Sequence, residues 1–278
     1  MNETTTQIIA RKGVSSENRG FLSKLHRYSG GLMTVQEAQK ILELPKKRVA
    51  QLLPHLAASG WLKRIKRGLY LLIPIEAMSP SKWSADDWQV ANCAFSPCYI
   101  GGWSAAHKWG LTDQLFNSTV VYSSHRVRSK ETHLGESSFL IHTVDKAHFF
   151  GLEPIWIGKD KIMVSDPSRT IVDILDTPIL GGGIRHTLEI LNQYFSSGHV
   201  NEDKLFVYLE KINNRAVFKR IGFLIEKGGL SATGVFIKKC LKMVNRGDAY
   251  LDPSLPHEGM RDKRWNIMIN VNIDDFAR

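Results

Sequence analysis

The stretch "WLKRIKRGLYLLIP", residues 61–74, decides the fold of the first quarter of the chain, because it sets basic residues beside a strongly apolar run. "WLKRI" and "LYLLIP" predict two strands, and "KRG" predicts a tight turn in which Gly68 supplies a positive φ. The basic residues about this turn are Lys63, Arg64, Lys66 and Arg67. The pattern therefore predicts a basic β-hairpin whose apolar side chains pack on neighbouring helices.

Two short helices are predicted directly before the hairpin, preceded by another over residues 15–28. Thr34 and Glu37 have the spacing of a capping box, which satisfies two backbone donors at a helix N-terminus. Pro45 ends that helix by restricting the residue before it, and it suits the first turn of the next helix. In this third helix the apolar residues recur at helical spacing and form a core face: Val49, Leu52, Leu53 and Leu56. Pro54 predicts a kink or an early end.

The opposite side of the third helix carries cations and one amide that can make a bidentate contact with adenine. The order of these elements, a helix, then a helix pair, then a basic hairpin, is typical of a winged helix-turn-helix. We therefore predict such a domain over residues 1–75, with the hairpin as its wing. The DNA-binding residues that we predict are Lys46, Lys47, Arg48, Gln51, Lys63, Arg64, Lys66 and Arg67. RNA binding, and protein contact through the same domain, are the alternatives.

The charge distribution supports this interpretation. The chain of 278 residues has a net charge of +10. Residues 1–75 hold 13 lysines and arginines against 4 acidic residues, whereas residues 76–278 hold 24 against 23. A basic module joined to a nearly neutral body is typical of proteins that bind a polyanion, and nucleic acid is the commonest polyanion in a cell. A solvated basic surface that aids solubility would give the same count.

Composition predicts a soluble cytoplasmic protein that does not engage a membrane. The N-terminus "MNETTTQIIARKG" lacks the apolar segment of a signal peptide, and no apolar run reaches about 18 residues. Three cysteines do not make a disulfide framework, which fits a reducing compartment. Cys93 and Cys98 are interpreted as small buried hydrophobic residues.

Proline and polar residues predict a linker at 76–85, followed by a mixed α/β domain over residues 86–278 with a helical second half. The fold class is therefore α+β. Ser84 is the expected cap of the first helix of this domain. Asp166 and Pro167 predict the start of a later helix, in which Arg169 pairs with Asp173 four residues on.

A metal-dependent nuclease is the enzymatic alternative, resting on Glu153, Asp160 and Lys161 around a predicted hairpin. Such an enzyme needs two or more carboxylates brought together beside a lysine, and acidic residues this near a turn are more often solvated. We therefore predict no catalytic residue, no cofactor and no metal site.

Four segments together resemble the AbiEi-type antitoxin and transcriptional regulator family. They are "RIKRGLYLLIP", "YIGGWSAAHKWGLT", "VSDPSRTIVDILDTP" and "LDPSLPHEGMRDKRWNIMIN", and with their order and spacing they extend from about residue 20 to 272. The resemblance implies a winged helix-turn-helix joined to a larger mixed α/β domain.

The resemblance also implies a function. The N-terminal domain would repress its own operon at inverted repeats in double-stranded DNA. The C-terminal domain would counter a nucleotidyltransferase-like toxin, as in type IV toxin-antitoxin systems, where the two proteins need not form a stable complex. The family's DNA-binding role would fall on Lys47, Arg48 and Gln51 and on the cations of the wing, and no functional residue carries over to the C-terminal domain. A transcriptional regulator without a toxin remains the alternative.

Overall fold

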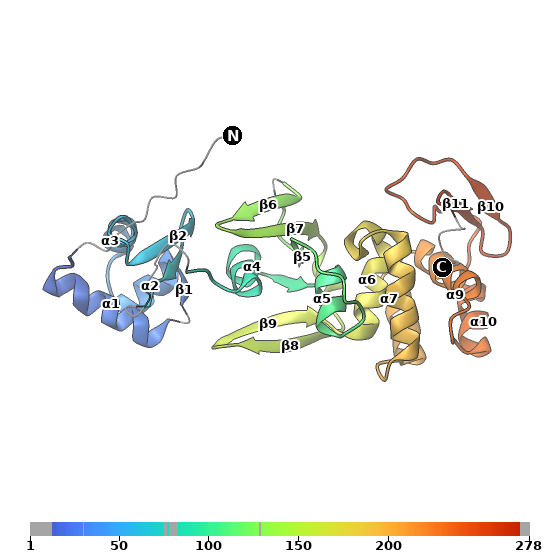
Figure 1. The fold of residues 1–278 in the computed structure, drawn as a ribbon, viewed down its shortest axis with the longest axis horizontal. Coiled ribbons are helices and arrows are strands. Elements are labelled where there is room, and N and C mark those ends of the chain that lie inside the picture. The colour runs from blue at the N-terminus through green and yellow to red at the C-terminus, as the bar shows by residue number, and fades with distance from the viewer. Residues whose placement is uncertain (1–12, 30, 75–76, 78–82, 128, 273–278) are drawn as a thin grey trace. The chain divides into compact units, whose positions relative to one another are not determined.

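The computed structural model describes residues 13–29, 31–74, 77, 83–127 and 129–272, and its fold is mixed α/β (Figure 1). Contacts divide the chain into two units. The first unit contains residues 1–97, 131–139 and 156–162, and the second contains residues 98–130, 140–155 and 163–278.

The first unit combines helices with a three-stranded sheet. Its elements are α1 (Ser16–Tyr28), β1 (Leu32–Thr34), α2 (Val35–Leu42), α3 (Lys46–Ala58), β2 (Leu62–Lys66), β3 (Leu69–Leu72) and α4 (Asp87–Phe95). Strand β3 lies between β1 and β2 and pairs antiparallel with both. Helices α1, α2 and α3 share one core with the hairpin, to which Leu25 of α1, Val49 and Leu53 of α3, and Leu62 and Tyr70 of the hairpin belong.

Local sequence signals explain how these elements begin. The predicted capping box is present, because the Thr34 hydroxyl accepts from the Glu37 N–H and the Glu37 carboxylate accepts from the Thr34 N–H. Gly68 has the positive φ of 85° that the hairpin turn requires. The early end suggested by Pro54 is wrong, because α3 continues through this residue to Ala58.

Helix α4 starts later than predicted and groups with the first unit. Its cap is Asp86, whose carboxylate accepts from the backbone of Trp88 at 2.9 Å, so the expected cap at Ser84 is wrong. The Phe95 ring lies edge-on to Phe139 with centroids 5.4 Å apart, which ties α4 to residues 131–139 of the same unit. We expected these helix residues in the C-terminal domain. Most of the predicted linker at 76–85 lies outside the described residues, and the predicted domain boundaries stay a prediction.

A mixed sheet precedes the helical half of the chain. The strands are β4 (Cys98–Ile100), β5 (Thr119–Ser123), β6 (Glu131–Leu134), β7 (Ser137–Thr143), β8 (Leu152–Ile157) and β9 (Asp160–Ser165). Their order in the six-stranded sheet is β6-β7-β5-β4-β9-β8. Strand β4 pairs antiparallel with β5 and parallel with β9. Helix α5 (Gly102–Lys108) follows β4, and a short 3-10 helix, η2 (Lys146–His148), follows β7.

Helices form the rest of the second unit. They are α6 (Pro167–Asp176), the 3-10 helix η3 (Pro178–Gly181), α7 (Ile184–Ser196), α8 (Glu202–Lys211), α9 (Ala216–Gly228) and α10 (Gly234–Lys242), followed by the antiparallel strands β10 (Met260–Asp262) and β11 (Ile267–Ile269). Asp166 caps α6 and Pro167 occupies its first turn, as predicted. None of the helices in the described ranges is long and apolar enough to cross a membrane.

The C-terminal strands complete the core around α9. Trp265 is 1% exposed, and its indole N–H donates to Glu226 of α9 at 2.7 Å. The ring lies against Gly222, where a Cβ atom would stand 2.0 Å from it. Arg220 of α9 is buried and donates to the carbonyls of Leu175 and Tyr250. Only glycine at position 222 therefore allows this close approach of α9 and the indole.

Candidate nucleic-acid interface

The exposed side of α3 carries the side chains that the sequence analysis selected. Val49, Leu53 and Leu56 are buried in the core of the first unit. Because these residues occupy one face at 3.6 residues per turn, the polar residues between them face solvent. The exposed predicted residues on this helix are Lys46, Lys47, Arg48 and Gln51.

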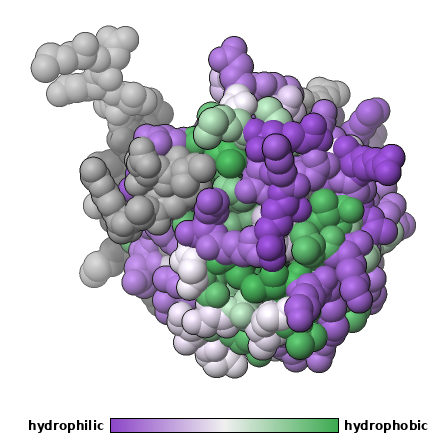
Figure 2. All heavy atoms as spheres, turned by 90° about the vertical axis from the view of Figure 1, so that its right-hand side faces the viewer, coloured by the Kyte–Doolittle hydropathy of each residue, from purple (hydrophilic) through white to green (hydrophobic). Residues whose placement is uncertain are grey.

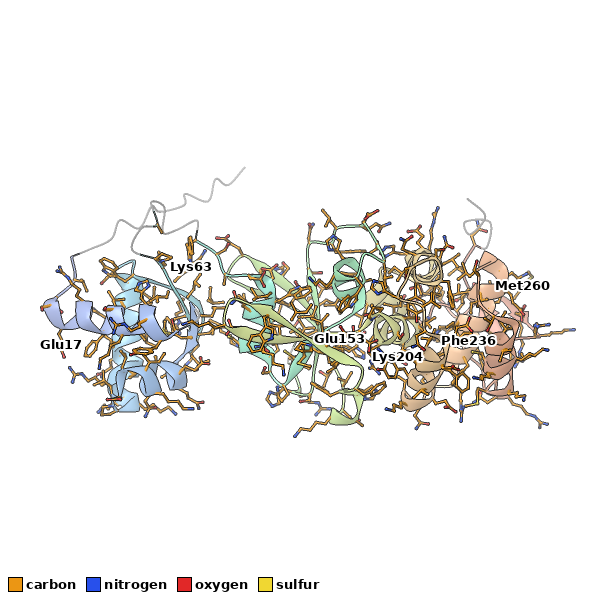
Figure 3. All side chains as sticks on the ribbon, turned by 90° about the horizontal axis from the view of Figure 1, so that it is seen from below. Glu17, Lys63, Glu153, Lys204, Phe236 and Met260 are labelled. Atoms are coloured by element: carbon orange, nitrogen blue, oxygen red, sulfur yellow. The ribbon has the colours of Figure 1, made fainter. Side chains whose placement is uncertain are left out.

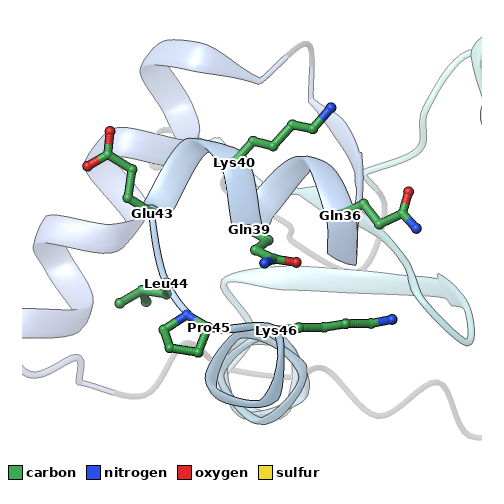
Figure 4. Close-up of a pocket in the computed structure, with 7 residues that line it drawn as sticks. All are labelled: Gln36, Gln39, Lys40, Glu43, Leu44, Pro45 and Lys46. Carbon is green, nitrogen blue, oxygen red and sulfur yellow. The ribbon is translucent and has the colours of Figure 1, made fainter.

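The N-terminus of α3 borders an open depression of about 720 Å³ between α2 and α3 (Figure 4). It is lined by Gln36, Gln39, Lys40, Glu43, Leu44, Pro45 and Lys46. Pro45 stands at the cap position without a side-chain cap, so the first turn of α3 presents its positive dipole end there. Lys40 and Lys46 add two cationic side chains, and the depression therefore has the charge and the polar groups to accept an anionic oxygen.

Arg48 is held differently from its neighbours on α3. Its guanidinium forms an ion pair with Glu17 of α1 and lies 5.7 Å from the centroid of the Phe21 ring. Glu17 is labelled in Figure 3. Both partners of this ion pair are more than half exposed, so the pair contributes little stability and a phosphate could displace the carboxylate.

The hairpin carries four cationic side chains. Two of them, Arg64 and Arg67, are exposed. Arg64 lies next to a register shift between β2 and β3, and Arg67 lies in the turn before Gly68. These two side chains are available to a ligand that approaches the hairpin. The structure thus presents Arg64 and Arg67, together with the exposed residues of α3, on the surface of one compact unit.

Lys63 and Lys66 instead make contacts inside the first unit. Lys63 donates to the Glu136 carboxylate at 2.8 Å and to the Trp83 carbonyl at 3.2 Å. Lys66 donates to the Ala94 carbonyl at 3.0 Å, and its ammonium lies 5.5 Å from the centroid of the Phe95 ring. Burial lowers the pKa of Lys66, with the nearby Cys93 opposing this effect. Both lysines therefore fasten the hairpin to other segments of the unit.

A second polar cluster lies buried in the second unit. Arg169 and Asp173 form the predicted ion pair at 2.8 Å, and both side chains are almost completely buried. The Tyr99 hydroxyl donates to Asp173 at 3.2 Å and accepts from Arg169 at 3.1 Å. Phe150 covers the guanidinium at 4.1 Å from its ring centroid. Burial raises the pKa of Asp173 to about 7, although the Arg169 charge opposes this rise.

The cap of α6 extends this cluster toward the surface. Asp166 accepts from the backbone of Arg169 at 2.9 Å, from the Tyr208 hydroxyl at 3.1 Å and from the Lys204 ammonium at 3.0 Å. The sequence indicated the cap and the Arg169 pair. It did not indicate Tyr99, Tyr208 or Lys204, because they come from β4 and α8 and only the fold brings them to α6. The cluster links β4, α6 and α8.

The residues of the nuclease alternative have ordinary environments. Glu153 is exposed on β8, and Lys161 is exposed on β9. The Asp160 carboxylate accepts from the Gln89 amide at 2.6 Å. Within the described ranges, no group of three or more histidine, cysteine or acidic residues is arranged to hold a metal ion. Cys98 and Cys240 are buried, and Cys93 is half-buried.

Comparison with known proteins shows a fold similarity without a family assignment. No family model matches the chain, and no curated protein matches it. Among solved structures, the crystal structure of the RV2827C protein from Mycobacterium tuberculosis is similar, with a TM-score of 0.67 and 13% sequence identity. The similarity covers 98% of this chain and 97% of that chain. At this identity it establishes a shared fold alone.

Proposed function

We propose that this chain is a sequence-specific DNA-binding regulator whose first unit is a winged helix-turn-helix domain. In this proposal α2 and α3 are the helix pair, α3 enters the major groove, and the β2–β3 hairpin is the wing. The observation that carries the proposal is the division of α3 into a buried apolar face and an exposed face with Lys47, Arg48 and Gln51. The excess positive charge of residues 1–75 supports the same assignment.

The exposed residues then divide between base and phosphate contacts. Gln51 would read a base edge, because a side-chain amide can donate to N7 and accept from N6 of adenine. Lys46 and Lys47 would contact phosphates beside the groove, and the first turn of α3 would receive one phosphate at its N-terminus. Arg64 and Arg67 would contact the backbone flanking the helix. Lys63 and Lys66 would set the orientation of the wing through their contacts within the unit.

The test is binding of the chain to the DNA upstream of its own gene. Replacing Lys47, Arg48 and Gln51 together by alanine should abolish the preference for this DNA over an unrelated duplex, with the far-ultraviolet circular dichroism unchanged. Fluorescence anisotropy with both duplexes measures the preference. An unchanged preference in this triple variant would contradict the proposal.

A matched control comes from α1. Arg19, Ser23 and Lys24 are exposed on this helix, so replacing them by alanine removes the same number of cationic and neutral polar groups. This control should bind with nearly the affinity of the original chain. If it loses the preference equally, net charge rather than the face of α3 determines recognition.

The resemblance to AbiEi-type proteins supports a more specific form of the proposal, in which the regulator is an autorepressor and the antitoxin of a nucleotidyltransferase-like toxin. Co-expression with the product of the adjacent gene tests it. Rescue of growth by the full chain, retained in the α3 triple variant, would assign the antitoxin activity to a part other than the DNA-binding face. If the product of the adjacent gene is not toxic, the alternative applies, in which the chain is a regulator that acts without a toxin.

A further inference from the structure

The buried cluster around Arg169 contains polar atoms that lack hydrogen-bond partners. The Arg169 side chain is 0% exposed, and its Nη2 atom donates to Asp173 and to the Tyr99 hydroxyl. Among the residues that the structure describes, none accepts a hydrogen bond from its Nε and Nη1 atoms. The Asp173 Oδ2 atom and the Tyr122 hydroxyl are also buried without a partner. Because buried polar atoms are almost always hydrogen-bonded, the cluster lacks groups that a polar ligand would supply.

A half-buried ring, that of Phe150, covers the buried guanidinium. Its centroid lies 4.1 Å from the Arg169 Cζ atom and 5.3 Å from the centroid of the Tyr208 ring. Phe150 belongs to the connection between η2 and β8. Phe149, by contrast, packs in the apolar cluster that contains Tyr99. The Phe150 side chain can therefore turn without breaking a helix, a strand or that cluster.

The backbone next to Phe150 is held in place. The Gly151 carbonyl accepts from the Asp166 N–H at 2.9 Å. A Cβ atom at Gly151 would stand 2.7 Å from the Tyr208 ring and 3.0 Å from the Arg169 Cβ atom, so the chain passes directly over these two side chains. Rotation of the Phe150 side chain is therefore the movement that uncovers the guanidinium.

A second cation lies against the same ring. The Lys211 ammonium is 5.3 Å from the Phe150 centroid. Lys211 is exposed at the end of α8, and it forms no ion pair with any residue in the described ranges. Lys204 of the same helix, labelled in Figure 3, is instead paired with Asp166 at 3.0 Å. The unpaired donors beside Phe150 thus come from Lys211 and from the buried guanidinium.

We propose that the Phe150 side chain covers a binding site for a phosphate group, in which the Arg169 guanidinium and the Lys211 ammonium are the donors. In the free chain both cations contact the ring, and a cation–π contact is weaker than a charge-assisted hydrogen bond. A phosphate that displaces the ring gains bonds to both cations, and it gives Nε and Nη1 of Arg169 the partner that they lack. We call Phe150, Arg169 and Lys211 the Phe150 site.

The donors of the Phe150 site favour phosphate over other anions. A guanidinium presents its N–H groups in one plane and matches phosphate or carboxylate oxygens, whereas a lysine ammonium is a point charge. The two donors come from different helices, α6 and α8, and a tetrahedral group with four oxygens can bond to both at once. A phosphate within a DNA duplex has a sugar on each side and would not reach a guanidinium that is 0% exposed. The ligand class is therefore a small molecule with a terminal phosphate.

Isothermal titration calorimetry of the full chain with inorganic phosphate tests the site, with chloride as the background anion and the ionic strength held constant. The original chain should bind one phosphate. Phe150→Ala should bind it about tenfold more tightly, because no ring has to be displaced. Lys211→Gln should bind it about tenfold more weakly, because it loses a charge-assisted hydrogen bond. Absence of phosphate binding in all three proteins would overturn the proposal, and so would weaker binding by Phe150→Ala.

Nuclear magnetic resonance of the arginine Nε–H groups reports on the buried donor directly. Phosphate should shift the Nε–H signal of Arg169, which Arg169→Lys identifies by its absence. If Arg169→Lys does not fold, comparison of the original chain with Phe150→Ala identifies the signal, because loss of the adjacent ring moves it. A signal that stays unshifted while phosphate binds would place the anion elsewhere and overturn the proposal.

The control variant comes from the exposed cations of the second unit. Figure 2 shows the end of this unit that carries α9, α10 and the β10–β11 hairpin, and hydrophilic side chains cover much of it, with apolar ones between them. Lys238 of α10 is an exposed lysine, so Lys238→Gln removes the same group as Lys211→Gln. This control should bind phosphate like the original chain. Loss of binding in Lys238→Gln, with Lys211→Gln unchanged, would mean that solvated lysines bind the anion and that the Phe150 site is wrong.

The Phe150 site is argued from the second unit alone and does not depend on DNA binding by the first. The triple variant of α3 should bind phosphate like the original chain. Phe150→Ala should keep the preference for the DNA upstream of the gene. Loss of phosphate binding and loss of sequence preference therefore appear in different variants, and failure of one proposal is distinguishable from failure of the other.

Discussion

At the scale of single residues, the hairpin shows why a basic stretch is not equivalent to a basic surface. Side chains alternate along a strand, so Lys63 and Arg64 face opposite sides of β2. Arg64 is exposed, whereas Lys63 pairs with Glu136, 73 residues away in the sequence. The sequence left the orientation of these two residues open, because the partner that decides it is distant. The same holds for Lys66, whose partners lie on α4.

The first prediction separates the two kinds of cation in the hairpin. Arg67→Ala should flatten the salt dependence of DNA binding by about 0.9 in slope, because one phosphate contact is lost. Lys66→Met should leave this slope unchanged and lower the free energy of unfolding by about 1 kcal/mol, since it removes the hydrogen bond to Ala94 and keeps the apolar stem. Salt titrations and urea unfolding of both variants measure the two effects. A flattened slope in Lys66→Met would place Lys66 on the DNA instead.

The second prediction concerns pH and Asp173. Burial raises the pKa of its carboxyl from 3.8 to about 7, so the folded state holds this proton where the unfolded state has released it. The contribution of Asp173 to stability is therefore fully present below about pH 4 and falls as the pH rises toward 7. Asp173→Asn cannot titrate and should lack this dependence. The difference in free energy of unfolding between the two proteins, measured from acid to neutral pH, isolates the group.

Other carboxylates titrate in both proteins, so their contribution cancels in that difference. The original chain should gain stability relative to Asp173→Asn as the pH falls. A difference that is constant, or that changes in the opposite direction, would mean that the Arg169 charge outweighs burial and keeps Asp173 ionised.

At the scale of elements, local signals predicted starts and turns well. The Thr34 capping box, the Asp166 cap and the turn at Gly68 depend only on residues within a few positions, and the structure contains all of them. The cap of α4 was predicted two residues early, because Ser84 and Asp86 are both good capping residues. The early end suggested by Pro54 is wrong, because packing of the Leu53 and Leu56 face holds α3 in helical form beyond it.

Contacts between distant elements could not be predicted in the same way. The sequence indicated that Arg169 pairs with Asp173, because both lie on one helix. It gave no sign of the Tyr99 hydroxyl between them, since β4 meets α6 only in the folded chain. The candidate interface on α3 was predictable because helical periodicity alone separates its two faces. The contacts of Lys63 and Lys66 in the β2–β3 hairpin could be found only from the fold.

The third prediction compares two glycines within helices. Gly222→Ala should destabilise the chain by about 1 to 3 kcal/mol or more, because the added Cβ would overlap the Trp265 ring. Gly20→Ala in α1 should instead stabilise it by about 0.5 to 1 kcal/mol, because nothing lies within 4 Å of the added atom and alanine favours the helix. Thermal and urea unfolding measure both. Stabilisation by Gly222→Ala would show that the indole packs elsewhere.

At the scale of the whole molecule, charge is concentrated at two places in the sequence. Residues 1–75 and residues 211–272 carry the excess, and the residues between them do not. Salt weakens DNA binding more strongly if both segments contact the DNA than if only one of them does. The counts over residues 76–278 conceal the second concentration of charge, because they average an acidic part and a basic part.

The fourth prediction is the salt dependence of the intact protein. About six phosphate contacts by the first unit alone would give a slope of log K against log salt of about −5. If the excess positive charge of residues 211–272 also contacts DNA, the slope on a long duplex should be steeper than on a short one. Anisotropy titrations between about 50 and 200 mM salt distinguish the two cases. Equal slopes on both duplexes would mean that one contact accounts for binding.

The position of Trp265 has a consequence for synthesis of the protein. Domains generally fold as units, and N-terminal ones fold first during translation. The first unit takes some of its contacts from residues 131–139 and 156–162, so the last of its residues is made just before α6. The indole that fills the space beside Gly222 is made more than a hundred residues later. A nascent chain can thus hold a folded first unit while the second unit still lacks part of its core. A messenger RNA truncated before the codon for Trp265 would therefore yield a chain with a complete first unit and an incomplete second unit.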